Sequence, residues 1–320
     1  MRKYGILSED KSTITTTENG YKINVSDIYT GSLDTTKKLT IACWGDSLTA
    51  GVGSSDEVTY PSVLSDLCKD TIDVISYGFG GKKSSEIAIR QGAIPITVDS
   101  CVIPEGSWVK LSFTSERCTP PSTVNSTSRV GINPCSLNGV EGRIIWNEDG
   151  YYFMRDRGGE SVEVDAGAQI ITYGTNNFMD DDIVIIWSGT NDRLGDVSTD
   201  EELKSKMEEL ISNQKEMLKH ANTENYIIIG LTPSYSNIEK INSFLKDEYK
   251  EHFLDIKEYL VNNGLQDAGI EATENDQNEI SHNRVPSSLL YDAIHFNSSG
   301  YKAIGNGVYK KLVSLGYISG

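Results

Sequence analysis

The sequence predicts an α/β protein in which a parallel sheet lies between two layers of helices and is interrupted by an antiparallel β module. Short apolar runs such as 39–44 and 183–187 alternate with amphipathic segments of helical period, the pattern of βαβ units. Between them, residues 95–178 show little helical periodicity but many short alternating segments separated by turn signals. Because the α/β pattern is the same on both sides, we interpret residues 95–178 as an insertion.

The elements of the α/β part follow from their apolar patterns. The continuously apolar run 183–187 is typical of a strand buried in a parallel sheet. Pro61 favours a helix start, because the first turn of a helix does not need its missing N–H. We expect strands at 38–44, 72–77, 183–187 and 226–231, and helices at 60–69, 84–91, 200–221, 237–263 and 299–315.

The patterns divide the chain into three parts. Residues 1–37 are rich in Thr, Ser, Lys and Asp and predict an extended lead-in with one edge strand around 21–25, compatible with a piece of a larger phage or cell-surface protein. Residues 38–94 and 179–320 form the α/β domain, called here the α/β core. Residues 95–178 form the β module, with strands expected at 108–113, 142–146, 151–154, 161–164 and 169–173.

Composition excludes several classes of function. The formal net charge of −17 argues against a nucleic-acid partner, which requires clustered Lys and Arg. No apolar run approaches the roughly 20 residues that span a bilayer, and the first residues lack the apolar segment of a signal peptide. The five cysteines show no metal-ligand spacing, so we expect neither a metal nor a cofactor. Their odd number favours reduced thiols, with a disulfide within 101–135 as the alternative.

Four short polar or glycine-rich blocks follow predicted strands or precede the last helix. A serine hydroxyl becomes a nucleophile when a histidine accepts its proton, and Ser47 and His295 supply this pair. Asp292, three residues before His295, can orient the imidazole within one turn. Glycine-turn N–H groups and an Asn amide can hold an oxyanion. Each block alone is explained as an ordinary turn or helix start, but the four together favour a hydrolase. The blocks are 45–48, 78–81, 189–192 and 292–295.

In this order, the blocks resemble those of the SGNH/GDSL hydrolase family over residues 38–92 and 180–318. They are Trp44-Gly45-Asp46-Ser47-Leu48-Thr49-Ala50-Gly51, Gly78-Phe79-Gly80-Gly81, Gly189-Thr190-Asn191-Asp192 and Asp292-x-x-His295, followed by the family-like Phe296-Asn297-x-x-Gly300. The resemblance implies a three-layer α/β/α sandwich of flavodoxin-like type. No G-x-S-x-G sequence surrounds Ser47, which disfavours an ordinary α/β-hydrolase.

The resemblance also implies roles for individual residues. Ser47 corresponds to the nucleophile, His295 to the general base and Asp292 to its orienting partner. The N–H groups of Ser47 and Gly81 and the side-chain amide of Asn191 correspond to the oxyanion hole. The second block of the family often begins with Asn, where this chain has Ser76, so Gly80 is the alternative glycine donor.

The substrate expected from the sequence is an acylated small molecule or polysaccharide, above all an O-acetylated carbohydrate. Aromatic and basic residues of the β module could contact sugar rings, although alternate aromatics also form ordinary small cores. The candidate substrate-binding residues are Asp46, Gly80, Trp146, Tyr151 and Arg193.

Two alternative functions stay open at this stage. One is a lipid esterase or thioesterase of the same family, which would need an apolar acyl channel that the sequence does not display. The other is a non-catalytic glycan-binding protein on a hydrolase scaffold, which would be expected to lack Ser47, Asn191 or His295. His282, in a polar segment without an Asp at useful spacing, is a weaker candidate base than His295.

Overall fold

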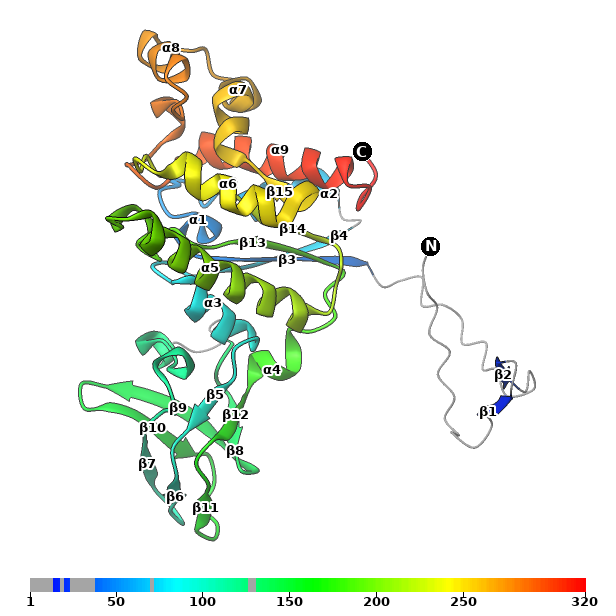
Figure 1. Cartoon of the computed structure of the whole chain (residues 1–320), viewed down its shortest axis with the longest axis vertical. Coiled ribbons are helices and arrows are strands. Elements are labelled where there is room, and N and C mark those ends of the chain that lie inside the picture. Colours follow the sequence, from blue (N-terminus) through cyan, green and yellow to red (C-terminus); the bar gives the residue numbers. More distant parts are fainter. Residues whose placement is uncertain (1–13, 18–19, 24–37, 70–71, 126–130) are drawn as a thin grey trace. The chain divides into compact units, whose positions relative to one another are not determined.

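A computed structural model describes residues 14–17, 20–23, 38–69, 72–125 and 131–320 (Figure 1). The chain divides into two compact units, Met1–Lys38 and Leu39–Gly320. In the first unit, β1 (Ile14–Thr17) and β2 (Gly20–Ile23) pair as an antiparallel hairpin, where the sequence predicts a single strand. The rest of the predicted lead-in lies outside the described residues.

A five-stranded parallel sheet forms the centre of the second unit. Its strand order is β15-β14-β13-β3-β4, and every neighbouring pair is parallel. All five residues of β13 are buried, as expected for the middle strand of a sheet covered on both faces. The strands are β3 (Leu39–Gly45), β4 (Ile72–Gly78), β13 (Ile183–Trp187), β14 (Tyr226–Ile229) and β15 (Phe253–Leu254).

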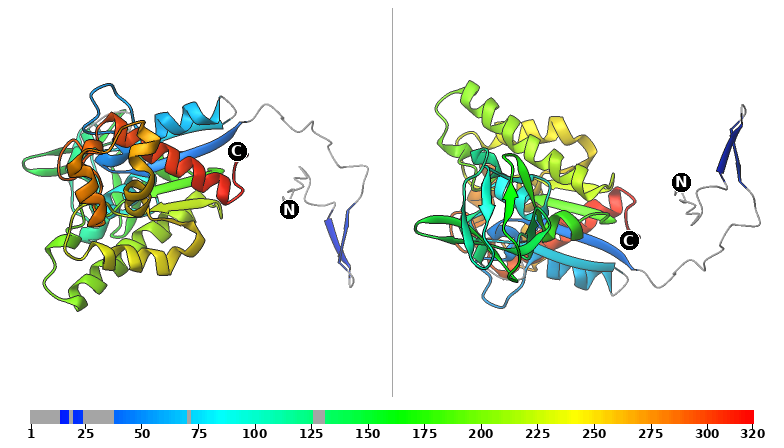
Figure 2. Two further views of the ribbon diagram at one scale, coloured as in Figure 1. Left: turned by 90° about the horizontal axis from the view of Figure 1, so that it is seen from above. Right: turned by 90° about the horizontal axis from the view of Figure 1, so that it is seen from below.

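Helices cover both faces of this sheet (Figure 1, Figure 2). On one face α9 (Ser298–Ser314) packs against α2 (Tyr60–Cys68) and α7 (Ile256–Ala268). On the other, α3 (Ser84–Gln91) packs against α5 (Asp200–Ala221). The predicted three-layer α/β/α architecture is therefore confirmed.

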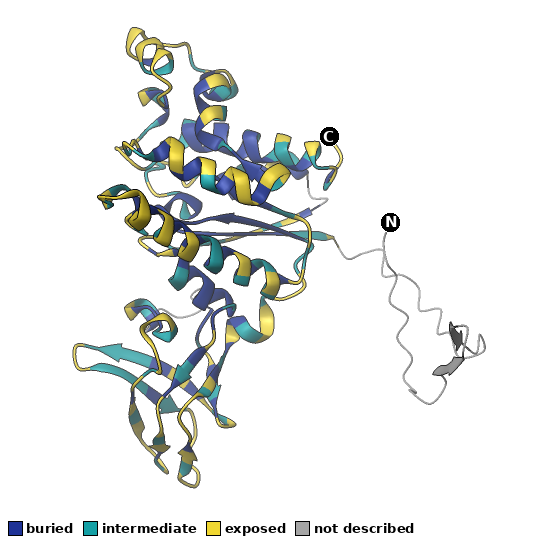
Figure 3. Cartoon of the chain, in the orientation of Figure 1, coloured by how far each residue is buried: buried dark blue, intermediate teal, exposed yellow. Residues whose placement is uncertain are grey.

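The long helix α5 shows how the sequence sets these layers. Leu203, Met207, Leu210 and Met217 recur at helical spacing and are buried, while the opposite face is exposed (Figure 3). The helix begins where the Thr199 side chain accepts a hydrogen bond from the backbone N–H three residues later, at 3.1 Å. Its bounds are those predicted from the sequence.

The predicted continuous helix over 237–263 is wrong. The structure has α6 (Ile238–Tyr249), a 3₁₀ turn, the short strand β15 and then α7. Lys250 takes the positive φ of 50°, which ends α6, and the buried pair Phe253 and Leu254 joins the sheet edge. A two-residue strand is too short to disturb helical periodicity, which explains the error. Helix α8 (Glu274–Ser281) was also not predicted.

Within the β module, six strands form an antiparallel sheet in the order β5-β12-β8-β9-β10-β7, and β6 pairs with β11. Ile144, Phe153 and Ile170 are fully buried in its core. None of the five cysteines forms a disulfide, so the predicted alternative of a disulfide within 101–135 is not found. The strands are β5 (Ile96–Val98), β6 (Cys101–Ile103), β7 (Trp108–Leu111), β8 (Cys135–Leu137), β9 (Val140–Asn147), β10 (Gly150–Arg155), β11 (Val162–Val164) and β12 (Ala168–Thr172).

After the last strand of the module, α4 (Tyr173–Asn177) leads back to the parallel sheet. The aromatic rings at this junction pack directly on one another. Trp44 stacks on Tyr77 with ring centroids 4.3 Å apart, and the Phe178 ring contacts Trp44 edge-on at 5.1 Å. These contacts anchor the end of the module beside the carboxyl ends of β3 and β4.

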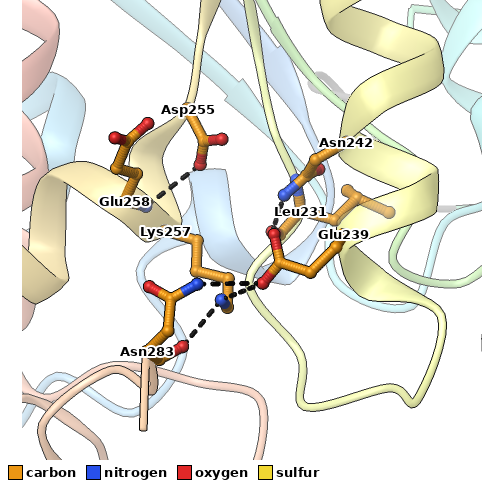
Figure 4. Close-up of polar contacts among 7 residues, drawn as sticks. All are labelled: Leu231, Glu239, Asn242, Asp255, Lys257, Glu258 and Asn283. Carbon is orange, nitrogen blue, oxygen red and sulfur yellow. Dashed lines mark hydrogen bonds and ion pairs between the residues drawn. The ribbon is translucent and has the colours of Figure 1, made fainter. Parts of the chain in front are cut away.

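A buried lysine connects helices α6 and α7 to the segment that leads toward residue 292 (Figure 4). The Lys257 ammonium donates to the Glu239 carboxylate at 2.6 Å and to the Asn283 carbonyl oxygen at 2.7 Å. These three residues line a cavity of about 350 Å³. Lys257 therefore joins three segments, two of which are also linked by the hydrogen bond from the Asn283 amide to Glu239 at 3.1 Å.

We expect Lys257→Ala to lower the free energy of unfolding by about 1–3 kcal/mol, since two charge-assisted hydrogen bonds are lost from a nearly buried site. Urea denaturation followed by circular dichroism measures this change. Lys246→Ala is the matched control, because Lys246 lines the same cavity but has no ion pair or side-chain hydrogen bond among the described residues. Equal stabilities of the two variants would contradict the prediction.

Candidate active site

Ser47 lies at the carboxyl end of β3, as the first residue of the short helix α1 (Ser47–Ala50). The strand ends at Gly45, where an added Cβ would lie 2.6 Å from the Trp187 carbonyl oxygen, so only glycine allows this approach of β3 to β13. The Asp46 carboxylate then accepts the Leu48 N–H at 2.9 Å and caps α1. This turn places Ser47 at the sheet edge where ligands of parallel α/β sheets bind.

A chain of hydrogen bonds connects Ser47, His295 and Asp292. His295 Nε2 lies 3.0 Å from Ser47 Oγ, and His295 Nδ1 lies 2.8 Å from Asp292 Oδ2. With the carboxylate ionised, Nδ1–H donates to Asp292 and Nε2 is free to accept the serine proton. The three side chains therefore lie in the order expected for a nucleophilic serine, a general base and an orienting carboxylate.

The turn that carries Asp292 and His295 is held by its own backbone. Asp292 Oδ1 accepts the N–H groups of Ile294 and His295 at 2.8 and 2.7 Å, so base and carboxylate are fixed in one local unit. Several contacts hold this unit and the start of α9 against the loop that carries Ser47, among them the hydrogen bond between Ser54 and Ser298. The Tyr301 hydroxyl donates to the Val52 carbonyl oxygen at 2.7 Å, and Gly53 (φ +97°) packs where a Cβ would lie 2.8 Å from that of Tyr291.

The glycine block after β4 borders Ser47. Phe79 N–H donates to the Gly45 carbonyl oxygen at 3.1 Å, which joins this block to the serine turn. An added Cβ at Gly80 would lie 3.8 Å from Ser47 Cβ, whereas Gly81, with φ +73°, faces open space. Gly80 therefore borders Ser47 and Gly81 is the next residue along the chain, and the choice between the two glycine donors stays a prediction.

Asn191 and Asp192, which follow β13, bond to residues directly after the glycine block. The Asn191 amide nitrogen donates to the Lys82 carbonyl oxygen at 3.0 Å and to Asp46 Oδ2 at 3.3 Å. The Asp192 carboxylate accepts both the backbone N–H of Ser84, at 2.9 Å, and its hydroxyl. Asn191 and Asp192 thus bond to Lys82 and Ser84, directly after the glycine block, and hold the end of the loop that would supply the oxyanion donor.

The carboxylates around the site have opposite pKa shifts. Burial raises the pKa of Asp46 to about 7, although the hydrogen bond from the Leu48 N–H acts to lower it. Burial also raises the pKa of Asp192. The backbone N–H of His295, its imidazole and the Ile294 N–H lower the pKa of Asp292 to about 2. Asp292 therefore remains ionised, as an orienting partner of an imidazole must.

The Asp46 shift makes folding stability depend on pH. The pKa rises from an ordinary 3.8 to about 7 on folding, so between these values the folded chain holds a proton that the unfolded chain lacks. The contribution of Asp46 to stability is thus fully present below about pH 4, falls as the pH rises and is lost above about pH 7. We expect Asp46→Asn to remove this dependence, with an effect on the order of a few kcal/mol, since one pKa unit corresponds to about 1.4 kcal/mol.

Urea denaturation of both proteins at pH 5 and pH 8 tests the Asp46 prediction. The free energy of unfolding of Asp46→Asn minus that of the wild type should be larger at pH 8 than at pH 5. A stability difference that is the same at both pH values would contradict it. Asp99→Asn serves as the control, because Asp99 is an exposed carboxylate of the β module.

The predicted substrate-binding residues divide into three groups. Arg193 and Tyr151 line one cleft of about 680 Å³, between the α/β core and the β module. Asp46 is fully buried beneath the serine turn, and Gly80 borders Ser47. Trp146 lies in β9, is partly buried and packs against buried hydrophobic side chains. His282, the weaker candidate base, bonds to Asn278 and Ser281 at the end of α8.

Several residues at the site carry no signal in the sequence. Arg117 and Lys83 line the same cleft from opposite walls, although 34 positions separate them in the chain. Beside His295, the Tyr291 side chain is 67% exposed, an unusual environment for a large ring. Only the tertiary placement of the β module and of the 291–295 turn reveals these positions.

Within the described ranges, no cluster of three His, Cys, Asp or Glu residues is arranged to hold a metal ion. None of the helices described has the length and apolarity needed to cross a membrane.

The family model of GDSL-like lipase/acylhydrolase matches residues 41–308. Similar solved structures include a variant of an acetyl xylan esterase from Geobacillus stearothermophilus (11% identity, TM-score 0.44, covering 86% of this chain and 94% of that one). Another is a family 3 carbohydrate esterase from Clostridium thermocellum (15% identity, TM-score 0.42, covering 87% and 97%).

A third is a carbohydrate acetylesterase family member from Sinorhizobium meliloti (12% identity, TM-score 0.40, covering 88% and 100%). These identities and TM-scores are too low to transfer a substrate to this chain. Comparison with curated proteins gives no significant match. The family match spans both the serine turn and the Asp292–His295 turn and most of the chain between them. The chain therefore belongs to the GDSL-like lipase/acylhydrolase family.

Proposed function

We propose that this protein is a serine esterase that hydrolyses O-acyl esters, above all O-acetyl esters carried by a carbohydrate. The observation that supports the reaction is the Ser47–His295–Asp292 chain, with separations of 3.0 and 2.8 Å. Family membership gives the broader class, an acyl ester hydrolase. The polar cleft beside the site favours a hydroxylated substrate over a long acyl chain, since charged walls would lose hydration against hydrocarbon.

In the proposed mechanism, Ser47 Oγ attacks the ester carbonyl carbon while His295 Nε2 takes its proton. The carbonyl oxygen becomes an oxyanion, which accepts hydrogen bonds from the N–H groups of Ser47 and Gly81 and from the Asn191 amide. Since an amide nitrogen has two hydrogens, Asn191 releases its longer bond to Asp46 Oδ2 when it donates to the oxyanion and keeps its bond to the Lys82 carbonyl oxygen. When the intermediate collapses, His295 gives its proton to the leaving alcohol oxygen, and the acyl group stays on Ser47.

Hydrolysis of the acyl-enzyme repeats the sequence with water. His295 takes a proton from the water, whose oxygen attacks the acyl carbonyl, and returns a proton to Ser47 Oγ as the carboxylic acid leaves. Asp292 holds the imidazole in the required tautomer and stabilises its cationic form. No step requires a group outside this chain and water.

Covalent labelling tests the proposed nucleophile directly. Diisopropyl fluorophosphate should react with one equivalent of enzyme, with fluoride as the leaving group, and peptide mass spectrometry should find the label on Ser47. The His295→Asn variant should label far more slowly, because the serine loses its base. His282→Asn is the matched control and should label at the wild-type rate. Labelling elsewhere, or equal rates in both variants, would overturn the proposal.

A further inference from the structure

The cleft of about 680 Å³ between the α/β core and the β module is lined by residues that closely follow the proposed oxyanion donors in the chain. Its core wall includes Lys83, two residues after Gly81, and Arg193, two residues after Asn191. Its opposite wall comes from the β module and includes Arg117, Ser122 and Tyr151. A substrate that reacts at Ser47 and extends past the oxyanion donors would therefore enter this cleft.

Contacts within the protein hold the two walls in place. Arg117 donates to the Asn213 side-chain oxygen on α5 at 3.3 Å, which joins the module to the core. The Tyr151 hydroxyl donates to the Pro120 carbonyl oxygen at 2.6 Å, and its ring meets Phe113 edge-on at 5.2 Å. The cleft is thus preformed, and its volume lies in the range of small-molecule sites, roughly 300–1,000 Å³.

The lining of the cleft specifies the chemistry of its ligand. Four basic and four acidic side chains face it, so it is close to neutral overall although the whole chain carries −17. Sugar hydroxyls both donate and accept hydrogen bonds, and such a mixture offers partners for both. The Tyr151 ring and the adjacent prolines add flat apolar surface for the C–H face of a ring. The four carboxylates would repel a polyanion. The eight charged side chains would lose hydration against a long acyl chain, so the cleft disfavours both ligands.

We propose that this cleft binds a neutral saccharide chain that carries the ester, so that the β module extends the site along the glycan. The proposal rests on the proposed esterase function and adds a subsite with named residues to it. Arg193 from the core and Tyr151 from the module contact the sugar units next to the one whose ester is cleaved. Substrates long enough to reach both walls are therefore bound better than a small ester.

Kinetics with substrates of graded length test the cleft. We would measure kcat/KM for 4-nitrophenyl acetate and for acetylated neutral xylo- and manno-oligosaccharides of two to six units. In the wild type, kcat/KM should rise with length on at least one of the two series. Arg193→Ala removes a contact with the sugar, and Ser122→Trp obstructs the cleft. Each should lower the kcat/KM for the hexamer, divided by the kcat/KM for 4-nitrophenyl acetate, about ten-fold or more, mainly by raising the KM for the hexamer.

Two matched controls keep the result specific to the cleft. Arg143→Ala removes a module cation that pairs with Asp156 outside the cleft, and Ser161→Trp adds the same ring at an exposed module position. Both should keep the wild-type ratio. A wild type that cleaves 4-nitrophenyl acetate through Ser47 but gains nothing from length, or cleft variants that match the controls, would overturn the subsite alone. Turnover that does not depend on Ser47 would instead overturn the esterase proposal on which it rests.

Discussion

Ser47→Ala is expected to lower kcat for 4-nitrophenyl acetate by on the order of 10⁴- to 10⁶-fold, the range found when a serine nucleophile is removed. The chain should stay folded, because the Ser47 hydroxyl contacts His295 and supports no other described side chain. Initial rates across substrate concentrations measure the loss, and circular dichroism checks the fold.

A serine in the same loop provides the control for this variant. Ser54 bonds to Asp56 and Ser298 rather than to the imidazole, so Ser54→Ala should keep the activity within about two-fold. Retention of more than about 1% of wild-type kcat by Ser47→Ala would be incompatible with Ser47 as the nucleophile.

The second large effect is expected at Asn191. Asn191→Ala should lower kcat by about 10²- to 10³-fold, the effect of losing one oxyanion donor. KM should change little, because the oxyanion forms only as the transition state is approached. Asn191→Asp should lose as much, since it keeps the size of the side chain but removes its donor hydrogens.

The remote Asn306, whose amide bonds only within α9, gives the control Asn306→Ala. The split between kcat and KM decides the role of Asn191. A rise in KM at unchanged kcat would make Asn191 a substrate-binding residue instead of an oxyanion donor.

Much of the fold could be predicted because its elements are long and strongly periodic. β13 is apolar at every position, and α5 has a capped, amphipathic pattern, so both have the predicted bounds. The pattern failed where a local break was shorter than one helical turn. Lys250 and the two residues of β15 end one helix and precede another without changing the apolar period, and only the packing of the sheet edge reveals them.

The candidate site shows the same division. Parallel strands end at one edge of a sheet, so blocks that follow β3, β4 and β13 must meet, and the sequence suffices to predict that Ser47 and Asn191 are neighbours. The bond between Asp192 and Ser84 could not be predicted, because it depends on the angle at which α3 leaves the sheet. The cleft between Arg117 and Lys83 likewise depends on how the β module packs on the core.

The proposed base and its carboxylate lie in one turn that is held by its own backbone, so the packing of this turn against the Ser47 loop decides whether all three groups align. Gly53 and Tyr301 lie in that interface, beside the hydrogen bond between Ser54 and Ser298. The Tyr301 hydroxyl donates to the Val52 carbonyl oxygen, and Gly53 leaves no room for a side chain. Substitution of Gly53 or Tyr301 would therefore misalign the three groups without changing any of them. A homologue could become inactive in this way while it keeps every residue of the four motifs.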